Sequence, residues 1–133
     1  MLISTKGRYA LRVLIDIAEH HTQERTPLKE IAERQNISQK YIEAIMTMLS
    51  KSGYVDASHG KGGGYKLNRK PEEYKVGDIL RLTEGTLAPV ACLEENAEDC
   101  PRKDVCRTLP LWTKLDDLVE NYLDSVTLAD LMK

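Results

Sequence analysis

Three cysteines are the residues of this 133-residue chain with the most specific chemistry. Cys92, Cys100 and Cys106 have the spacing C-x7-C-x5-C, without the paired C-x2-C hooks of structural zinc sites. Thiolates bind iron–sulfur clusters and zinc, and three thiols cannot all pair within one chain. The spacing therefore leaves two interpretations open: a metal or cluster site, and unrelated free thiols.

The cysteines lie in a stretch without legible periodicity, residues 86–108. Such a long irregular segment in a short chain is usually functional or disordered. Regular elements must position it from both sides. Apolar residues at 76, 79, 80 and 82 predict a short helix before it, ended by Gly85, and the helical pattern resumes at Leu109.

A polar-faced helix is predicted after Ser38, which is a suitable N-cap. Gly53 supplies its C-terminal stop. One face is apolar through Ile42, Ile45, Met46 and Leu49, and the opposite face carries Gln39, Lys40, Glu43 and Thr47.

The neighbours of this helix complete a recognisable motif. A shorter helix precedes it within residues 26–37, and Asn36 can adopt the left-handed conformation of the turn between them. Glycine-rich residues 60–64 predict a hairpin tip, with residues 65–67 as the return strand. A helix pair followed by a two-stranded wing predicts a mainly α fold of the winged helix-turn-helix class, whose second helix enters the major groove of DNA.

The first helix is predicted to begin at Ser4 or Thr5, with Lys6 and Arg8 near its start. These two charges are either phosphate contacts or solubilising surface groups, and the sequence favours neither. The last helical stretch spreads apolar residues over more than one face, which predicts a two-fold partner helix, because a helix-turn-helix reading a palindrome needs two copies. Packing on its own domain is the alternative. The apolar residues of that stretch are Trp112, Leu115, Leu118, Val119, Tyr122, Leu123 and Val126, followed by a capping box that begins at Thr127.

The distribution of charge supports a nucleic-acid partner more than its total of −2 does. Residues 1–83 hold fourteen Lys or Arg and ten Asp or Glu, a net of +4, whereas residues 84–133 hold five and eleven, a net of −6. There is no apolar run of eighteen residues and no signal peptide, so we expect a cytoplasmic protein without a membrane partner. No nucleophile, base and orienting group are legible, so we do not expect an enzyme.

Several segments together resemble the IscR family of bacterial winged-helix transcription regulators, over nearly the whole chain. They are STKGRYAL, LKEIAERQNIS, YIEAI, GKGGGY, LTEGTLAPVAC and DSVTLADLM. The resemblance implies a winged helix-turn-helix DNA-binding domain at 1–83, a cysteine-containing sensor loop at 84–108, and a long C-terminal dimerisation helix with its cap at 109–133. It also implies a homodimer that binds double-stranded DNA at a palindromic operator, with a repressor as the expected type.

In IscR-like proteins three cysteines of this loop hold an iron–sulfur cluster, and they match Cys92, Cys100 and Cys106 in order. The resemblance therefore implies a cluster, with [2Fe-2S] expected and the nuclearity open. The first gap is longer here than in IscR, and the family's histidine ligand is replaced by Leu109. Nitric-oxide-sensing relatives use an aspartate whose position here is Arg8. The fourth ligand stays open among solvent, a small thiol, a partner-chain group and the loop carboxylates Glu94, Glu95, Glu98, Asp99 and Asp104.

The same resemblance implies which residues meet DNA. Helix residues matching Ser38, Tyr41 and Glu43 approach the bases, and wing residues matching His59, Gly60 and Lys61 reach the groove or backbone. A carboxylate such as Glu43 accepts from cytosine N4 but repels phosphate. IscR has arginine at the position of His59, so that contact is expected to be weaker or pH-dependent. The predicted DNA-binding set is Ser38, Gln39, Lys40, Tyr41, Glu43, His59, Gly60 and Lys61.

The predicted function is thus a DNA-binding transcription regulator that senses iron–sulfur cluster or redox status through three cysteines. One alternative keeps DNA binding and replaces the cluster by thiol oxidation or zinc. A second alternative is an adaptor that uses the winged helix for protein contacts and does not bind DNA.

Overall fold

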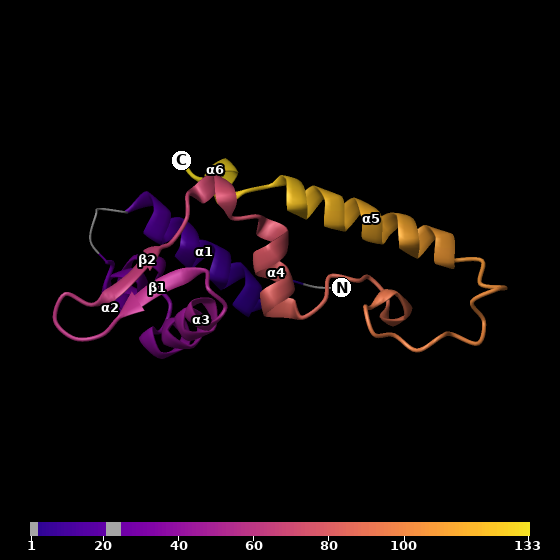
Figure 1. The fold of residues 1–133 in the computed structure, drawn as a ribbon, viewed down its shortest axis with the longest axis horizontal. Helices are drawn as coiled ribbons and strands as arrows, with labels where there is room; N and C mark the ends of the chain where they lie inside the picture. The colour runs from indigo at the N-terminus through magenta and orange to yellow at the C-terminus, as the bar shows by residue number, and fades with distance from the viewer. Residues whose placement is uncertain (1–2, 21–24) are drawn as a thin grey trace.

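The computed structural model describes residues 3–20 and 25–133. A compact end holds most of the helices and the small sheet, and a long helix projects from it (Figure 1). The mainly helical winged fold expected from the sequence is confirmed. The elements are α1 Thr5–Glu19, α2 Leu28–Gln35, α3 Gln39–Lys51, β1 Val55–Ser58, β2 Gly64–Leu67, η1 Pro71–Glu73, α4 Val76–Glu84, η2 Ala91–Leu93, α5 Leu109–Ser125 and α6 Leu128–Leu131.

The core lies between α1, α2 and α3. The apolar face predicted for α3 is buried at all four positions, and the face of α1 meets it with side chains that are equally inaccessible. Burying each such aliphatic side chain contributes about 1.5–3 kcal/mol, which fixes the rotation of the recognition helix about its axis. The inward residues of α1 and α3 are Ala10, Val13, Leu14, Ile17, Ile42, Ile45, Met46 and Leu49.

Caps and turns fall where the sequence indicated. The Ser4 hydroxyl accepts from the Gly7 N–H at 3.1 Å, and the Ser38 hydroxyl accepts from the Tyr41 N–H at the same distance. Asn36 has φ of 53°, the left-handed conformation that turns the chain from α2 into α3. These local signals set where the helix-turn-helix begins, turns and resumes.

The wing is an antiparallel pair in which Val55 faces Leu67 and Ser58 faces Gly64. The return strand therefore begins at Gly64, one residue earlier than predicted. Thr26 adds a bridge outside the hairpin, exchanging backbone hydrogen bonds of 2.8 and 2.9 Å with Tyr65. A side chain at position 64 would collide with the Thr26 carbonyl, so this glycine allows the wing to dock on the segment before α2.

Helix α4 packs on α1 and holds its N-terminus. Glu84 accepts hydrogen bonds from the Ser4 N–H at 2.6 Å and from the Ser4 hydroxyl at 2.8 Å. A Cβ on Gly7 would lie 2.6 Å from the Glu84 carboxylate, so this close packing depends on the glycine. The start of α1 is thereby tied to the end of α4.

The chain returns to the compact end after α5. Thr127 forms the predicted capping box with Asp130, and Leu128 is completely buried in the core. The Leu128 N–H donates to the Tyr74 carbonyl at 3.1 Å. By its contacts α6 is therefore part of the winged-helix core, while α5 buries none of its residues and lies outside it. No helix in residues 3–20 and 25–133 has the length and apolar character to cross a membrane.

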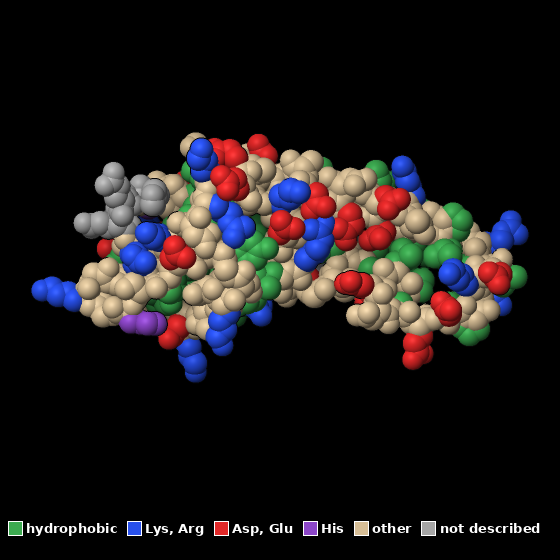
Figure 2. Space-filling view, viewed as in Figure 1, with side chains coloured by type: hydrophobic (Ala, Val, Ile, Leu, Met, Phe, Trp, Pro, Cys, Tyr) green, Lys and Arg blue, Asp and Glu red, His purple; other side chains and the backbone are tan. Residues whose placement is uncertain are grey.

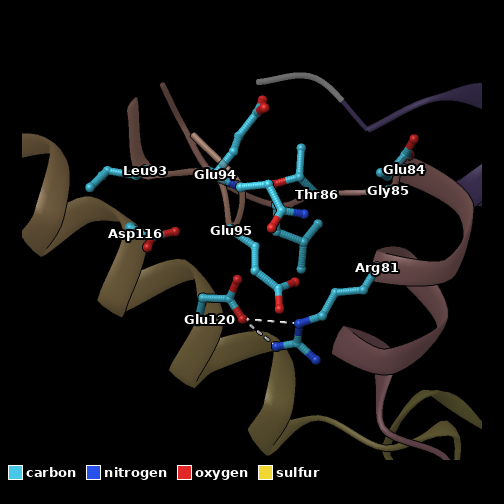
Figure 3. Close-up of a pocket in the computed structure, with 12 residues that line it drawn as sticks. Arg81, Glu84, Gly85, Thr86, Leu93, Glu94, Glu95, Asp116 and Glu120 are labelled. Carbon is cyan, nitrogen blue, oxygen red and sulfur yellow. Dashed lines mark hydrogen bonds and ion pairs between the residues drawn. The ribbon is translucent and has the colours of Figure 1, made fainter. Parts of the chain in front are cut away.

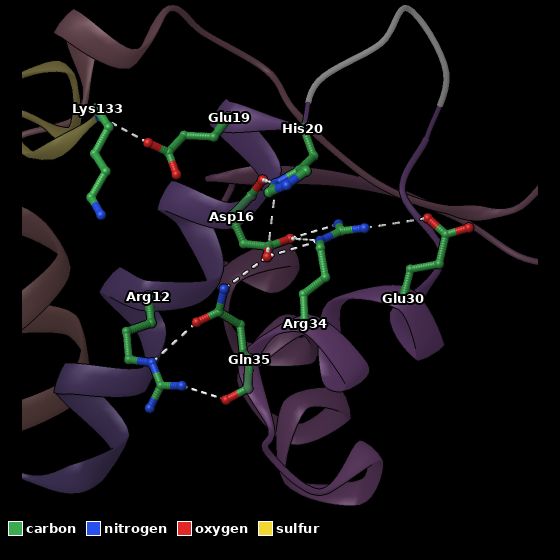
Figure 4. A network of polar contacts seen from close by, with 8 residues as sticks. All are labelled: Arg12, Asp16, Glu19, His20, Glu30, Arg34, Gln35 and Lys133. Carbon is green, nitrogen blue, oxygen red and sulfur yellow. Dashed lines mark hydrogen bonds and ion pairs between the residues drawn. The ribbon is translucent and has the colours of Figure 1, made fainter.

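A buried charge network joins α1 to α2 (Figure 4). The Asp16 side chain is fully inaccessible and accepts three hydrogen bonds of 2.7–3.1 Å from Arg34. The Gln35 amide donates to the same carboxylate at 2.8 Å. Because a buried carboxylate is costly unless it is paired, this geometry fixes how α2 lies against α1.

Candidate nucleic-acid interface and cysteine cavity

All eight residues of the predicted DNA-binding set are exposed to solvent. Four of them, Gln39 and Glu43 of α3 with His59 and Gly60 of the wing, line one hollow of about 300 Å³. The other four are exposed outside this hollow, on the first turn of α3 and at the wing tip: Ser38, Lys40, Tyr41 and Lys61. The fold therefore brings the N-terminal half of α3 and the wing to a common surface.

Tyr65 is a member of this hollow that the sequence did not single out. Partial burial, and then the negative charge of Glu43, raise the pKa of the Tyr65 hydroxyl above its ordinary value. Glu43 forms no ion pair with any residue that the structure describes. The Glu43 carboxylate therefore lines the hollow beside Tyr65, and no described cation pairs with it.

Tyr41 is supported from α1. Its ring meets the ring of Tyr9 edge-on, with the centroids 5.6 Å apart. The Arg12 guanidinium lies 5.0 Å from the Tyr9 centroid and donates from Nε to the Gln35 side chain at 3.1 Å. Sequence reasoning missed Tyr9 and Arg12, because their contacts cross from α1 to α2 and α3.

Charge is divided along the long axis of the molecule. In Figure 2 basic side chains project from the lower and outer edges of the compact end, while acidic side chains gather where α4 and α5 meet. The exposed Lys40 and Lys61 belong to the basic end. This separation supports contact of the compact end with a polyanion.

The cysteine loop (residues 84–108) lies at the opposite end from the wing (Figure 1). All three cysteines are free thiols, and all three line one cavity of about 200 Å³. The rest of the lining consists of three carboxylates, one lysine and three apolar residues: Glu94, Glu98, Asp99, Lys103, Leu93, Ala97 and Leu109.

The pKa of the Cys106 thiol is lowered by its neighbour Thr108. The Cys106 Sγ lies 3.5 Å from the Thr108 hydroxyl, and hydrogen bonds from the Thr108 side chain and then the Thr108 backbone lower the pKa of Cys106. The thiolate is the form that binds metals.

The donor set fits an iron–sulfur cluster or zinc, because three thiols and oxygen donors share one cavity. The thiols do not yet converge on one point: within 3–20 and 25–133 no three His, Cys, Asp or Glu side chains are grouped closely enough to hold a metal ion. Backbone hydrogen bonds between residues 90 and 106 join residues three apart, such as Glu94 to Ala91 and Lys103 to Cys100. A loop held only by such local turns can rearrange at little cost.

A second cavity, of about 570 Å³, is lined by residues of α4, of α5 and of the loop between them (Figure 3). Arg81 spans it, donating to Glu120 and, at 2.8 Å, to Asp124. Burial, and then the charges of Glu120 and Asp117, raise the pKa of Asp116. In Figure 3 the Glu95 side chain extends toward Arg81 and Glu120.

A family model described as "Rrf2: Iron-dependent Transcriptional regulator" matches residues 3–133. The chain is 42% identical over 133 residues to protein rrf2 of Nitratidesulfovibrio vulgaris, covering 100% of this chain and 88% of that protein. It is 40% identical to the HTH-type transcriptional regulator CymR of Bacillus subtilis (98% and 89% covered), and 36% identical to the HTH-type transcriptional regulator IscR of Aliivibrio salmonicida (99% and 77% covered).

Solved structures of CymR and IscR proteins have the same fold as this chain. The global cysteine regulator CymR of B. subtilis superposes with a TM-score of 0.78 at 39% identity, covering 98% of this chain and 95% of that one. IscR of T. potens superposes with a TM-score of 0.75 at 37% identity, covering 98% and 85%. Regulators with and without the name IscR are thus similarly close in sequence and fold.

Proposed function

The chain belongs to the Rrf2 family of transcriptional regulators, and on that premise we propose that it couples operator binding to iron–sulfur status through a cluster held by Cys92, Cys100 and Cys106. Like its relatives, it is a DNA-binding regulator and not an enzyme. The observation that carries the proposal is the sharing of one cavity by all three thiols.

The DNA-binding surface in this proposal is the exposed start of α3 with the wing. Gln39, Tyr41 and Glu43 would face base edges, because the N-terminal turns of a recognition helix enter the major groove. Lys40, Lys61 and His59 would face the backbone or groove edge. Their exposure, and the basic character of this end of the molecule, support that assignment.

A homodimer on a palindromic operator is part of the same proposal. Four exposed apolar residues follow one another along α5 at intervals of four, three and four, the spacing of a helix–helix seam. Such a stripe on a helix without a fully buried residue favours a second copy of α5 as its cover. The residues are Leu111, Leu115, Leu118 and Tyr122.

Within the cavity the chain's own residues have distinct tasks. The three thiolates would hold the cluster, and hydrogen bonds from Thr108 lower the pKa of Cys106, which favours the thiolate that binds metals. A bound cluster would supply one-electron redox chemistry and sensitivity to oxidants. The local turns of the loop allow the thiols to move toward one another.

Thiol oxidation is the second candidate, favoured by the free and largely exposed state of the cysteines. A solved relative is the oxidised form of CymR from Staphylococcus aureus, at 35% identity. In this chain hydrogen peroxide would oxidise two of the thiols to one disulfide and be reduced to two molecules of water.

Anaerobic purification followed by visible spectroscopy, with iron and sulfide analysis, separates the candidates. The cluster proposal expects charge-transfer absorbance with iron and sulfide in equal amounts, lost on replacing Cys92, Cys100 and Cys106 by alanine. Protein free of iron and sulfide that forms a disulfide with peroxide would favour thiol oxidation. Stoichiometric zinc without sulfide would refute both.

A further inference from the structure

We propose that the cluster's fourth ligand is a carboxylate of the cysteine loop itself, supplied by Glu94, Glu98 or Asp99. This inference rests on the proposed function, because it concerns a ligand to the cluster. The motive is that each of these carboxylates lines the same cavity as the three thiols. Histidine, the ligand that the resemblance implies at position 109, is replaced here by leucine.

The five loop carboxylates differ in the cavities that they line. Glu98 and Asp99 line only the cysteine cavity, Glu94 lines both cavities, Glu95 lines only the α4–α5 cavity, and Asp104 lines neither. Figure 3 shows the contrast between neighbours: Glu94 extends away from Arg81, whereas Glu95 extends toward it. Position in the sequence does not make this distinction, since Glu94 and Glu95 are adjacent.

The three carboxylates of the cysteine cavity are also uncommitted. Within the described residues none of them makes an ion pair, and none accepts a side-chain hydrogen bond. Two acidic residues at the α4–α5 cavity are engaged, since Glu120 and Glu84 both accept hydrogen bonds, whereas Asp116 and Glu95 at the same cavity accept none from the described residues. An anionic oxygen without a partner can bind iron without first losing another contact.

Leu109 favours a ligand from the loop, because it replaces the family's histidine. It lines the cysteine cavity from the first turn of α5, but its side chain carries no donor atom. Cavity-lining donors that remain after the thiols are the three carboxylates and the Lys103 ammonium, which cannot coordinate while protonated. A hard oxygen ligand holds iron less firmly than a soft thiolate does, so the cluster would be labile at this position.

The test uses the full chain, reconstituted anaerobically with iron and sulfide. One variant combines Glu94→Gln, Glu98→Gln and Asp99→Asn, and its matched control combines Glu95→Gln and Asp104→Asn. We expect the triple variant to lose iron to a chelator faster by about tenfold or more, with changed electron paramagnetic resonance of the reduced cluster. The control should keep the wild-type rate and spectrum.

A rescue sharpens the test. Leu109→His in the triple background places an imidazole on the wall of the same cavity, so it should slow iron loss again and give a nitrogen-ligated spectrum. Wild-type retention and spectrum in the triple variant would overturn the inference, because the ligand would then come from solvent, a small thiol or the partner. Absence of a cluster from the wild-type protein would instead refute the proposed function, before any variant is compared.

Thermal melts of the cluster-free proteins guard against an indirect effect. The triple variant should melt with the wild type, because the three carboxylates are exposed and lie outside the core. If the triple variant melts at a lower temperature, each of its three substitutions is tested alone. The inference then requires that at least one single variant loses iron faster than the wild type while melting at the wild-type temperature. Three single variants with wild-type iron retention would overturn the inference.

Discussion

Glu43 is the only acidic residue of α3, and it stands on the surface that is proposed to face DNA. Its carboxylate has no cation partner among the described residues, and its influence reaches Tyr65 across the hollow. Thr47, one turn later, donates only to the Glu43 carbonyl, at 2.8 Å. An unpaired carboxylate on this surface can disfavour wrong DNA sequences as well as bind the right one.

Glu43→Ala is therefore expected to broaden sequence preference with little loss of affinity. The carboxylate can accept from cytosine N4 but repels phosphate, so its removal lowers the penalty on wrong sequences. Binding of a panel of operator variants at one salt concentration measures this. Glu43→Gln is the matched control for size. Lower affinity with unchanged preference would show that Glu43 is an anchor.

Asp16 is the residue on which the orientation of α2 depends. Asp16→Ala should destabilise the fold by about 3 kcal/mol, the low end for breaking a buried pair, because Arg34 is 30% exposed and can be rehydrated. Glu30→Ala, which removes an exposed partner 3.6 Å from the same arginine, should cost less than about 0.5 kcal/mol. Urea unfolding of both variants is the measurement, and equal losses would contradict the special role of the buried pair.

At the scale of elements, α3 and the wing form one surface although they are separate in the sequence. The bridge between Thr26 and Tyr65 docks the hairpin on the segment before α2, and the apolar face of α3 packs against α1. Each element is thus held by the core through its buried side, while polar groups are left on the outer side. The geometry of the surface is a property of how these elements dock.

Lys40→Ala and Lys61→Ala should each weaken binding to specific and random duplexes alike. One lies at the start of α3 and the other at the wing tip, and each lost phosphate contact should lower the salt slope by about one unit. Titrations at several salt concentrations give the slope. Lys114→Ala, on α5, is the control. Unchanged slopes for both variants would make these lysines simple surface charges.

The apolar seam of α5 leads to a prediction about assembly. Leu118→Glu should convert the proposed dimer into monomers and weaken operator binding, because a charge cannot be buried between two helices without a partner. Leu118 is 55% exposed in the single chain, so its replacement should leave the monomer fold intact. Thr113→Glu, an exposed position off the seam of the same helix, should keep the dimer. Sedimentation distinguishes them, and a dimeric Leu118→Glu would refute the seam.

On the scale of the whole molecule, the cysteine loop and the wing occupy opposite ends (Figure 1). The physical connection between them runs through α5 and α4. Arg81 links α4 to Glu120 and Asp124 of α5, and Glu84 links α4 to the start of α1. A change at the cavity can bias DNA binding only if holo and apo protein differ in operator affinity.

Replacing the three cysteines together by alanine should abolish binding of the proposed cluster while leaving the proposed dimer folded. None of the three is buried, and the loop contributes no residue to the main core. Operator titrations with holo protein, apo protein and the triple variant should give equal affinities for the last two and a different one for holo protein. Equal affinities for all three on every operator tried would remove the sensing role.

Thermal melts of the same samples complete that experiment. Apo protein and the triple variant should melt together, because the fold is built on α1, α2 and α3 and not on the loop. A collapsed melt for the triple variant would mean that the thiols support folding, which would refute a sensor that is separate from the core.

The sequence predicted those features that depend on neighbouring residues. Ser4, Ser38 and Asn36 act within a few residues of themselves, so their caps and turn were legible without a fold. The burial of one face of α3 followed from its 3.6-residue period. The fold class followed from the order of these elements, and the resemblance of several segments indicated the family that the comparisons then established.

Only the tertiary structure decided which residues meet across elements. The pairing of Asp16 with Arg34, the docking of α6 through Leu128, and the presence of Glu94 but not Glu95 in the cysteine cavity depend on how the packed chain places its segments. Periodicity states which side of a helix is buried but not against what. Local hydrogen bonding is encoded residue by residue, whereas a cavity exists only once the packing of the whole chain has placed its walls.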